Sequence, residues 1–255
     1  MLRQAIRKSF RAALLAKGLR VPPGLCIKDL SKILFNRVER DVVQVARTLV
    51  REGDVVLDVG ANMGLTARAF CRLVGPNGKV FAFEPDPMTA ELLRHNTRRF
   101  PQCVVMTAAV SDQPGQATFH VHPTSTAGSS LVALKNDHRK ITVPCMSLDQ
   151  VIDENKLTRV ALVKIDVEGA EALVLKGFRQ TLPRSRGLPL IVEFSPENLR
   201  NAGTSPEEFF QVLRDAGLDV ASTDENGASN PAASCQDLLA RLNSQGYLNL
   251  LCVKS

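Results

Sequence analysis

The chain has 255 residues, of which 44% are hydrophobic and 23% are charged. This composition is typical of a globular protein and excludes disorder throughout. Its apolar runs have the length of strands, and none reaches the roughly 18 residues that a transmembrane helix needs. A formal net charge of +6 suggests nucleic acid as a partner. The chain has one Tyr and no Trp, however, so few aromatic side chains are available to stack on bases.

The positive charge is concentrated near the N-terminus. Residues 1–40 contain ten basic and two acidic residues, a charge of +8, whereas residues 41–255 carry −2. The nearly neutral body therefore gives no electrostatic case for a nucleic-acid partner. The sequence predicts a basic helical extension over residues 1–50 and one larger domain over residues 51–255.

The extension begins with an amphipathic pattern. Apolar residues recur every four positions, which is helical spacing, at Leu2, Ile6, Phe10 and Leu14. Gly18 and the Pro-Pro-Gly run at 22–24 end the pattern. Three interpretations are open: a helix docked on the larger domain, a peripheral membrane contact through residues 1–20, or an Arg-rich targeting peptide. Docking is the favoured one.

The cysteines indicate a reducing compartment. None of the six has C-x-x-C spacing, and several lie in apolar patterns typical of buried free thiols. The sequence therefore predicts a cytoplasmic protein. If the basic helix contacts a membrane, the protein would be attached to the membrane surface.

From Glu52 onward strand-like and helix-like segments alternate. Strands are expected at residues 54–59, 79–83, 103–108, 160–165, 188–194, 218–222 and 247–253. Helices are expected after Gly64, at 88–99, at 147–152, from Ala170, and at 206–215 and 236–243. Segments 116–121 and 141–144 are expected to pair as an extra hairpin, and 223–234 is expected to be a polar loop. The alternation predicts an α/β fold with a mostly parallel sheet and helices on both faces. Ligands in such folds bind beyond the carboxyl ends of the strands.

The first strand runs into a glycine loop that differs from a dinucleotide-binding loop. The pattern is D-x-G-x-N-x-G, with Asp58, Gly60, Asn62 and Gly64, where a nicotinamide enzyme would have G-x-G-x-x-G. A carboxylate in this loop favours a cationic ligand over a pyrophosphate. The sulfonium and amino groups of S-adenosylmethionine make it such a ligand.

Two further segments are candidates for the cofactor. Glu84 ends the second strand, 24 residues after Gly60, where a carboxylate can accept both hydroxyls of a ribose. Ser111 and Asp112 follow the third strand, where an adenine would lie. Ribose belongs to both cofactors, so only the loop discriminates between them, and a nicotinamide-dependent oxidoreductase remains the alternative.

Several short motifs together resemble the FkbM family of S-adenosylmethionine-dependent methyltransferases. They are the loop at 55–64, F-E-P at 83–85, A-A-V-S-D at 108–112, S-L-D at 147–149 and K-I-D-V-E-G-A-E at 164–171. The resemblance covers about residues 50–222 and implies a class I methyltransferase fold. It also implies O-methylation of a sugar, glycolipid or polyketide-like hydroxyl, with cofactor contacts from Gly60, Ala61, Asn62, Gly64, Glu84 and Pro85.

Carboxylates lie at the carboxyl ends of the two strands at 160–165 and 188–194. If strand geometry persists past Ile165, Asp166 and Glu168 project to the same side, and Glu193 ends the next strand. Asp166 is the leading candidate for general base or acceptor-orienting group, with Glu168 and Glu193 assisting or binding the acceptor. The competing roles are a cofactor contact for Asp166 and stabilisation of a helix N-terminus for Glu168 and Glu171. Lys164 is placed to pair with one of these acids.

The predicted partner is a small-molecule or glycan hydroxyl acceptor. The carboxylates are also able to hold a divalent metal, although no motif indicates one. His120 and His122 are two apart on an edge segment and are interpreted as surface residues. A catalytically silent module that retains the cofactor fold is the remaining alternative, and the acids at 166, 168 and 193 count against it.

Overall fold

The computed structural model describes residues 2–35, 39–122, 129–132, 139–242, 244 and 246–254. The strands of the main sheet are β1 (Val55–Val59), β2 (Lys79–Phe83), β3 (Cys103–Met106), β7 (Leu162–Ile165), β8 (Pro189–Phe194), β9 (Leu218–Thr223), β10 (Ser229–Pro231) and β11 (Leu248–Lys254). Their order within the described residues is β10-β9-β11-β8-β7-β1-β2-β3. The five strands from β8 to β3 run parallel, and β9, β10 and β11 add an antiparallel edge.

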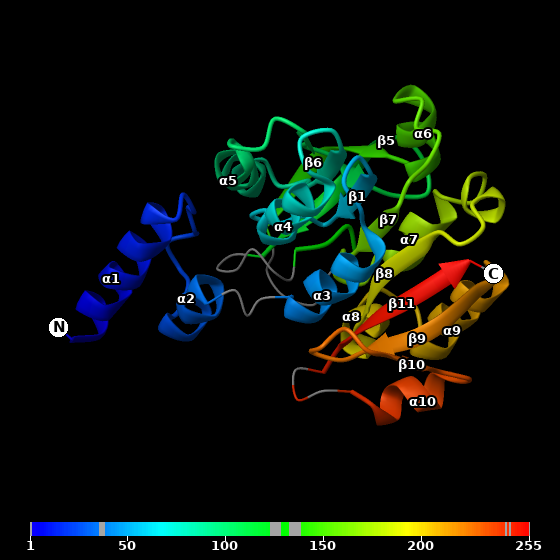
Figure 1. Cartoon of the computed structure of the whole chain (residues 1–255). Coiled ribbons are helices and arrows are strands. Elements are labelled where there is room, and N and C mark those ends of the chain that lie inside the picture. Colours follow the sequence, from blue (N-terminus) through cyan, green and yellow to red (C-terminus); the bar gives the residue numbers. More distant parts are fainter. Residues whose placement is uncertain are drawn as a thin grey trace.

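Helices cover both faces of this sheet (Figure 1). They are α1 (Leu2–Ala16), α2 (Ile27–Leu34), α3 (Arg40–Leu49), α4 (Leu65–Val74), α5 (Pro87–Thr97), α6 (Leu148–Glu154), α7 (Glu171–Lys176), α8 (Pro196–Asn201), α9 (Pro206–Asp215) and α10 (Cys235–Ala240). A second sheet has the order β4-β6-β5, with β4 (Ala109–Val110), β5 (Gly115–Val121) and β6 (Arg139–Met146). The predicted α/β class with a mostly parallel sheet is confirmed.

Side chains alternate between the two faces along each strand, because successive residues of a strand point to opposite sides. Val56, Val80 and Leu162 pack with α3 and α4 on one face. Leu57 and Val163 pack on the other face in the larger cluster, together with residues of α6, α7, α9 and α10. Each strand is thus apolar on both sides, which explains its continuous hydrophobic pattern.

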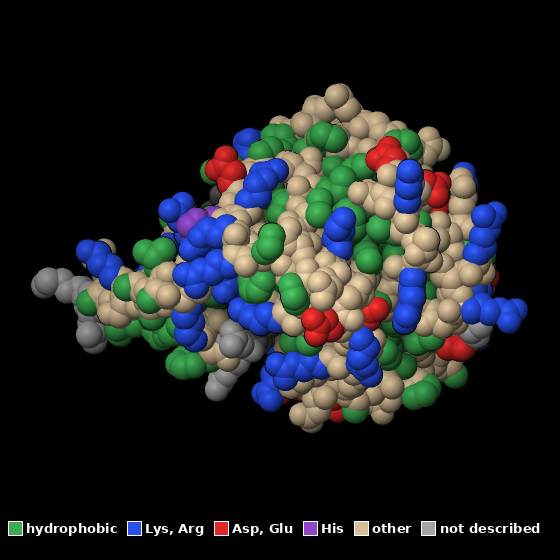
Figure 2. Space-filling view, turned by 45° about the horizontal axis from the view of Figure 1, so that its top comes forward, with side chains coloured by type: hydrophobic (Ala, Val, Ile, Leu, Met, Phe, Trp, Pro, Cys, Tyr) green, Lys and Arg blue, Asp and Glu red, His purple; other side chains and the backbone are tan. Residues whose placement is uncertain are grey.

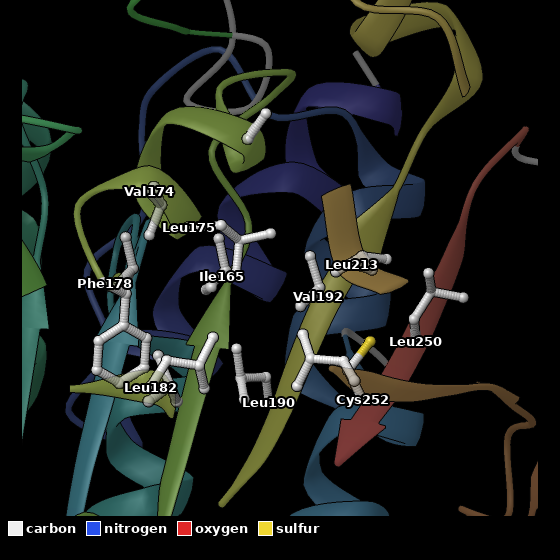
Figure 3. Packing of buried hydrophobic residues seen from close by; sticks show 14 of the residues in the cluster. Ile165, Val174, Leu175, Phe178, Leu182, Leu190, Val192, Leu213, Leu250 and Cys252 are labelled. Atoms are coloured by element: carbon white, nitrogen blue, oxygen red, sulfur yellow. The ribbon is translucent and has the colours of Figure 1, made fainter. Parts of the chain in front are cut away.

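Figure 3 shows the larger cluster from close by. Ile165 of β7 and Val192 of β8 lie on the same side of the sheet as Leu250 of β11, and all three are fully buried. Val174 of α7 and Phe178 lie on the Ile165 side of this cluster, and Leu213 of α9 lies next to Val192. This packing fixes β7 and β8, so the side chains that follow these strands are held on a rigid base.

The end of α1 docks on the larger domain through an apolar cluster. Leu14, Leu30 and Ile33 pack with Met63, which lies in the glycine loop after β1. Asn96 of α5 is fully buried, donates to the carbonyl oxygens of Met63 and Arg20, and accepts from the Arg20 amide. The docking interpretation of the helix is therefore correct for this end, while the first turns of α1 project from the body (Figure 1).

Basic side chains gather where the extension meets the body (Figure 2). Arg98 and Arg68 donate to the carbonyl oxygens of Gly18 and Lys17, just after α1, at 3.0 and 3.4 Å. Cations are favourable at the C-terminus of a helix because its last carbonyls carry partial negative charge. On α1 itself, Arg7 donates to the carbonyls of Gly24 and Leu25. Part of the basic excess thus serves to hold the extension in place, and contact of residues 1–20 with a membrane stays a prediction.

Some expected elements differ in the structure. The segment 223–234 is not only a loop, because β10 pairs antiparallel with β9. This strand was missed because Ser, Asn and Pro have low strand propensity, and an exposed edge needs only backbone pairing. The strand expected at 103–108 is present as β3 but ends at Met106, and β4 of the second sheet follows it at residues 109–110.

Other expectations fall on shorter segments. The extra hairpin is present as β5 and β6, with Gln116 opposite Pro144, while residues 123–128 of its connection lie outside the described residues. The helix expected at 236–243 is α10, and residue 243 also lies outside.

His120 is buried rather than on the surface. All six cysteines are free thiols, as predicted. No helix among the described residues is long and apolar enough to cross a membrane.

The tightest approach in the fold lies at Gly60, and it gives a test. Gly60 has φ +77°, and a Cβ there would lie 1.8 Å from the carbonyl oxygen of Asp166. Gly60→Ala is therefore expected to lower the free energy of unfolding by more than the roughly 1–2 kcal/mol that left-handed backbone costs an ordinary residue. Urea denaturation measures this. The control is Gly203→Ala, because Gly203 has φ +80° and open space around it. Equal losses for the two variants would contradict the close approach.

Candidate active site

A cavity of about 940 Å³ opens at the carboxyl ends of β1, β2, β7 and β8. This edge is where open α/β sheets bind ligands. The volume is at the upper end of the roughly 300–1,000 Å³ typical of ligand pockets, so it can hold a cofactor together with a second small molecule.

The structure brings most of the predicted site residues to this cavity. Those that line it are Gly60, Asn62, Glu84, Pro85, Asp166, Glu168 and Glu193. Five others do not line it, namely Asp58, Ala61, Gly64, Ser111 and Asp112. Beyond β3 the wall is formed by residues 108–110 instead of Ser111 and Asp112. Ser111 donates its hydroxyl hydrogen to Asp112 at 3.0 Å.

The loop after β1 is held against β2 by its backbone. The amides of Gly60 and Ala61 both donate to the carbonyl oxygen of Phe83, at 3.1 and 2.9 Å. Asn62 is left-handed, with φ +50°, and its Oδ1 accepts from the Met63 amide. Gly64 has φ +85° and begins α4. Ala61 and Gly64 thus shape the loop, while Gly60 and Asn62 face the cavity.

One buried cation holds the centre of the site. Lys164 is 1% exposed, and its Nζ lies 3.0 Å from both Asp166 Oδ2 and the Gly60 carbonyl oxygen. Glu39 Oε2 and Asp58 Oδ1 lie at 3.7 and 3.8 Å. Burial lowers the pKa of Lys164, but the attraction of these three carboxylates outweighs it and raises that pKa above its usual value. The predicted pairing of Lys164 with an acid of this edge is confirmed.

Asp58 lies beneath the loop rather than in the cavity. Its side chain is fully buried, and Oδ2 accepts from the Thr66 hydroxyl at 2.9 Å. Burial raises the pKa of this carboxyl, and the charge of Lys164 opposes the shift. Asp58 therefore acts on the site through Lys164 and Thr66, a support role that its position in the sequence motif did not reveal.

Glu84 stands at the end of β2 with its carboxylate almost enclosed. Its Oε1 accepts from the Asp86 amide at 2.9 Å. Burial raises the pKa of Glu84 to about 8, and this hydrogen bond only partly opposes the shift. Burying a carboxylate next to the glycine loop is energetically unfavourable, which indicates that this group binds a polar part of a ligand.

The turn after β7 differs from the expected continuation of the strand. β7 ends at Ile165, and Glu168 is left-handed with φ +56°. Glu171 shapes this turn, since its buried Oε1 accepts from the amides of Val167 and Gly169 at 3.1 and 3.2 Å. Asp166 and Glu168 still both reach the cavity, but the turn brings them there instead of strand alternation.

Glu193 completes the acid group from β8. Burial, followed by the negative charges of Asp166 and Glu168, raises its pKa well above the usual value. Its Oε2 is enclosed without a hydrogen-bond donor among the described residues. Glu168 differs in this respect, because its Oε2 accepts from Asn198 Nδ2 at 2.7 Å.

The cavity also contains residues from distant parts of the chain that no sequence motif marks. Glu39 and Asp41 line the cavity from the extension, and Tyr247 and Asn249 line it from the region of β11. Asn249 stands opposite Glu193 in the β8–β11 pairing and donates to Asp41 Oδ2 at 2.7 Å. A polar residue in an otherwise apolar strand was the available signal for Asn249, whereas nothing in the sequence marks Glu39.

Backbone strain also concentrates here. Among the described residues, four other than glycine have positive φ: Glu39, Asn62, Lys156 and Glu168. Three of these line the cavity. Such conformations are costly and collect at functional sites, where surrounding structure enforces them. The described residues contain no group of three or more His, Cys, Asp or Glu arranged to hold a metal ion.

Fold and cavity define an α/β protein with an acidic ligand pocket at the carboxyl ends of its parallel strands. The chain belongs to the FkbM methyltransferase family, because the Methyltransferase FkbM domain model matches residues 58–220. It is 30% identical over 201 residues to the hexuronic acid methyltransferase AglP of Haloferax volcanii, covering 78% of each chain. It is also 30% identical to the 2-O-methyltransferase NoeI of Sinorhizobium fredii, covering 61% of this chain and 69% of that one.

A solved structure supports the fold. The O-methyltransferase from Bacillus cereus in complex with SAH matches with a TM-score of 0.50 and 13% identity, covering 99% of this chain and 91% of that chain. The chain is thus an S-adenosylmethionine-dependent O-methyltransferase, and the nicotinamide alternative is not favoured.

The residues present fit this cofactor. Lys164 faces three carboxylates, and Glu193 adds a fourth nearby, so the site has more acids than cations. The sulfonium and ammonium groups of the cofactor would offset this negative charge, whereas a pyrophosphate would add to it.

The raised pKa of Glu84 predicts that this residue costs stability. Between about pH 4.5 and 8 the folded chain keeps a proton on Glu84 that the unfolded chain has released, so stability falls as pH rises through this window. Relative to the wild type, Glu84→Gln should gain up to about 1.4 kcal/mol per pH unit across it. Urea denaturation of the cofactor-free protein at several pH values measures the gain.

The control for this effect is Glu91→Gln, on the exposed surface of α5. Its stability relative to the wild type should not change with pH. A Glu84→Gln difference that is equally flat with pH would show that burial of this carboxylate is not costly.

Proposed function

We propose that the chain methylates a hydroxyl of a sugar or sugar-like small molecule. A single observation carries this: one cavity contains both the glycine-loop side, with Gly60, Asn62 and Glu84, and the acid side, with Asp166 and Glu193. Methyl transfer requires donor and acceptor in line within one enclosed volume, so a shared cavity is what the reaction needs.

The glycine-loop side is assigned to the cofactor. Glu84 would accept hydrogen bonds from the ribose hydroxyls, and Gly60 and Asn62 would contact the chain beyond the ribose. Pro85 and residues 108–110 offer the wall for the adenine ring, a role that the sequence predicted for Ser111 and Asp112. When bound, S-adenosylmethionine supplies an activated methyl group.

The acid side is assigned to the acceptor. Asp166 Oδ2 already lies 3.0 Å from Lys164 Nζ, so Asp166 is assigned to orienting the acceptor. Glu193 is the stronger candidate for the proton acceptor, because its buried carboxylate has a raised pKa and an oxygen without a donor. Glu168, fixed by Asn198, would bind a second hydroxyl. The general-base role predicted for Asp166 thus passes to Glu193.

Basic side chains that line the cavity without forming an ion pair favour an acceptor that carries an acid group. The extension contributes Lys28, Lys32 and Arg40 to the cavity wall, and none has a carboxylate within 4 Å among the described residues. The neighbouring acids Asp29 and Asp41 are occupied by Cys26 and Asn249. The relative AglP is named for a hexuronic acid, which has both hydroxyls and a carboxylate.

Binding and transfer test the assignment directly. S-adenosylmethionine and S-adenosylhomocysteine should raise the melting temperature, following RT ln(1 + [L]/Kd), and NAD and NADP should not. With labelled methyl donor, p-nitrophenyl glycosides of hexuronic acids should be methylated faster than those of the matching neutral hexoses. Stabilisation by a nicotinamide nucleotide alone would overturn the cofactor assignment, and faster transfer to neutral hexosides would overturn the acidic acceptor.

Glu193→Gln tests the proton acceptor. Loss of a general base is expected to lower kcat by roughly 10²–10⁴-fold, while cofactor affinity stays near that of the wild type. The wild-type rate should rise with pH, because a carboxyl with a raised pKa must ionise before it accepts a proton. Glu91→Gln again serves as the control. A Glu193→Gln enzyme with wild-type kcat would remove the residue from the chemistry.

A further inference from the structure

Glu39 brings a carboxylate into the cavity from outside the segment that matches the family model. That match begins at residue 58, whereas Glu39 lies in the extension, just before α3. Its side chain reaches across to β7, where Oε2 lies 3.7 Å from Lys164 Nζ. The extension therefore contributes to the site itself and not only to its outer wall.

The position of Glu39 is unfavourable in the absence of a ligand. Its backbone is left-handed, with φ +48°, which an ordinary side chain rarely adopts. Its Oε2 is enclosed with no hydrogen-bond donor among the described residues. Lys164 meets this need only by charge, because its Nζ lies 3.7 Å from Oε2, beyond hydrogen-bond distance, while it lies within 3.0 Å of Asp166 and the Gly60 carbonyl. A buried carboxylate oxygen without a donor is costly, so a donor from a ligand would relieve the cost.

The order of strands indicates which part of the cofactor would meet Glu39. β1 lies between β2 and β7 in the sheet, so Glu84 and Lys164 stand on opposite sides of the glycine loop. With the ribose at Glu84 and the adenine toward β3, the amino-acid end of the cofactor extends the other way, toward β7. An ammonium group there offers three N–H donors and a positive charge.

We propose that Glu39, together with Asp166, binds the α-ammonium group of S-adenosylmethionine, so that the extension completes the cofactor site. The inference rests on the cofactor assigned above. The ammonium group would donate to Glu39 Oε2, which has no donor among the described residues, and its charge would balance the excess of acids around Lys164. Docking of α1 and α2 on Met63 fixes the extension next to the same loop.

Calorimetric titration of Glu39→Gln with three ligands tests the proposal. S-adenosylmethionine and S-adenosylhomocysteine carry the ammonium group, whereas 5′-methylthioadenosine has the adenine and ribose without the amino-acid end. The variant should bind the first two about tenfold or more weakly, since hydrogen bonds to charged groups are the stronger ones. Its affinity for 5′-methylthioadenosine should equal that of the wild type.

The matched control is Asp29→Asn. Asp29 is another carboxylate of the extension that lines the cavity, but it accepts from the Cys26 thiol and lies on α2. All three ligands should bind this variant as they bind the wild type. The control thus separates a contact with the ammonium group from a general change in the charge of the extension.

Each other outcome is decisive. Unchanged affinities in Glu39→Gln would overturn the proposal, and so would an equal loss for all three ligands, which would make Glu39 a structural residue. Tighter binding of the two amino-acid ligands would indicate that Glu39 faces their carboxylate instead. A wild-type chain that binds none of the three would overturn the cofactor assignment and this inference with it.

Discussion

The buried amino group of Lys164 is the contact on which the site depends. It joins the glycine loop at Gly60, the strand β7 that carries it, Asp58 beneath the loop and Glu39 of the extension. Taking a charge out of water costs several kcal/mol unless partners compensate it. Lys164 has enough partners, but the carboxylates around it outnumber its single charge. The buried charge of Lys164 is therefore well compensated, whereas the negative charges of the carboxylates around it are only partly compensated.

This imbalance accounts for the acidity of the whole cavity. Burial raises the pKa of Glu39 and Glu171 to about 7 and that of Glu84 to about 8, so these side chains lower the stability of the fold near neutral pH. Proteins keep such groups where function requires them. A cationic cofactor and an acceptor rich in hydroxyls are the two kinds of ligand that would satisfy them.

The extension has two separate electrostatic functions in this picture. Arg68 of α4 and Arg98, which directly follows α5, donate to the carbonyls that follow α1, and Arg7 of α1 donates to the carbonyl of Gly24. Farther along, Glu39 contacts Lys164, while Lys28, Lys32 and Arg40 line the cavity without carboxylate partners among the described residues. Part of the basic excess near the N-terminus therefore serves to dock the extension and to line the site.

The sequence by itself determined most strands of the main sheet, the glycine loop, Glu84 and the acids at the ends of β7 and β8, because strand periodicity and short motifs are local properties. Only the tertiary structure decided what lies between them. It placed Asp58 under the loop, brought Asp166 and Glu168 to the cavity through a left-handed turn, and added Glu39 and Asn249 from distant parts of the chain. Contacts across more than a hundred residues leave no local pattern, since they depend on how the extension and β11 pack against the sheet.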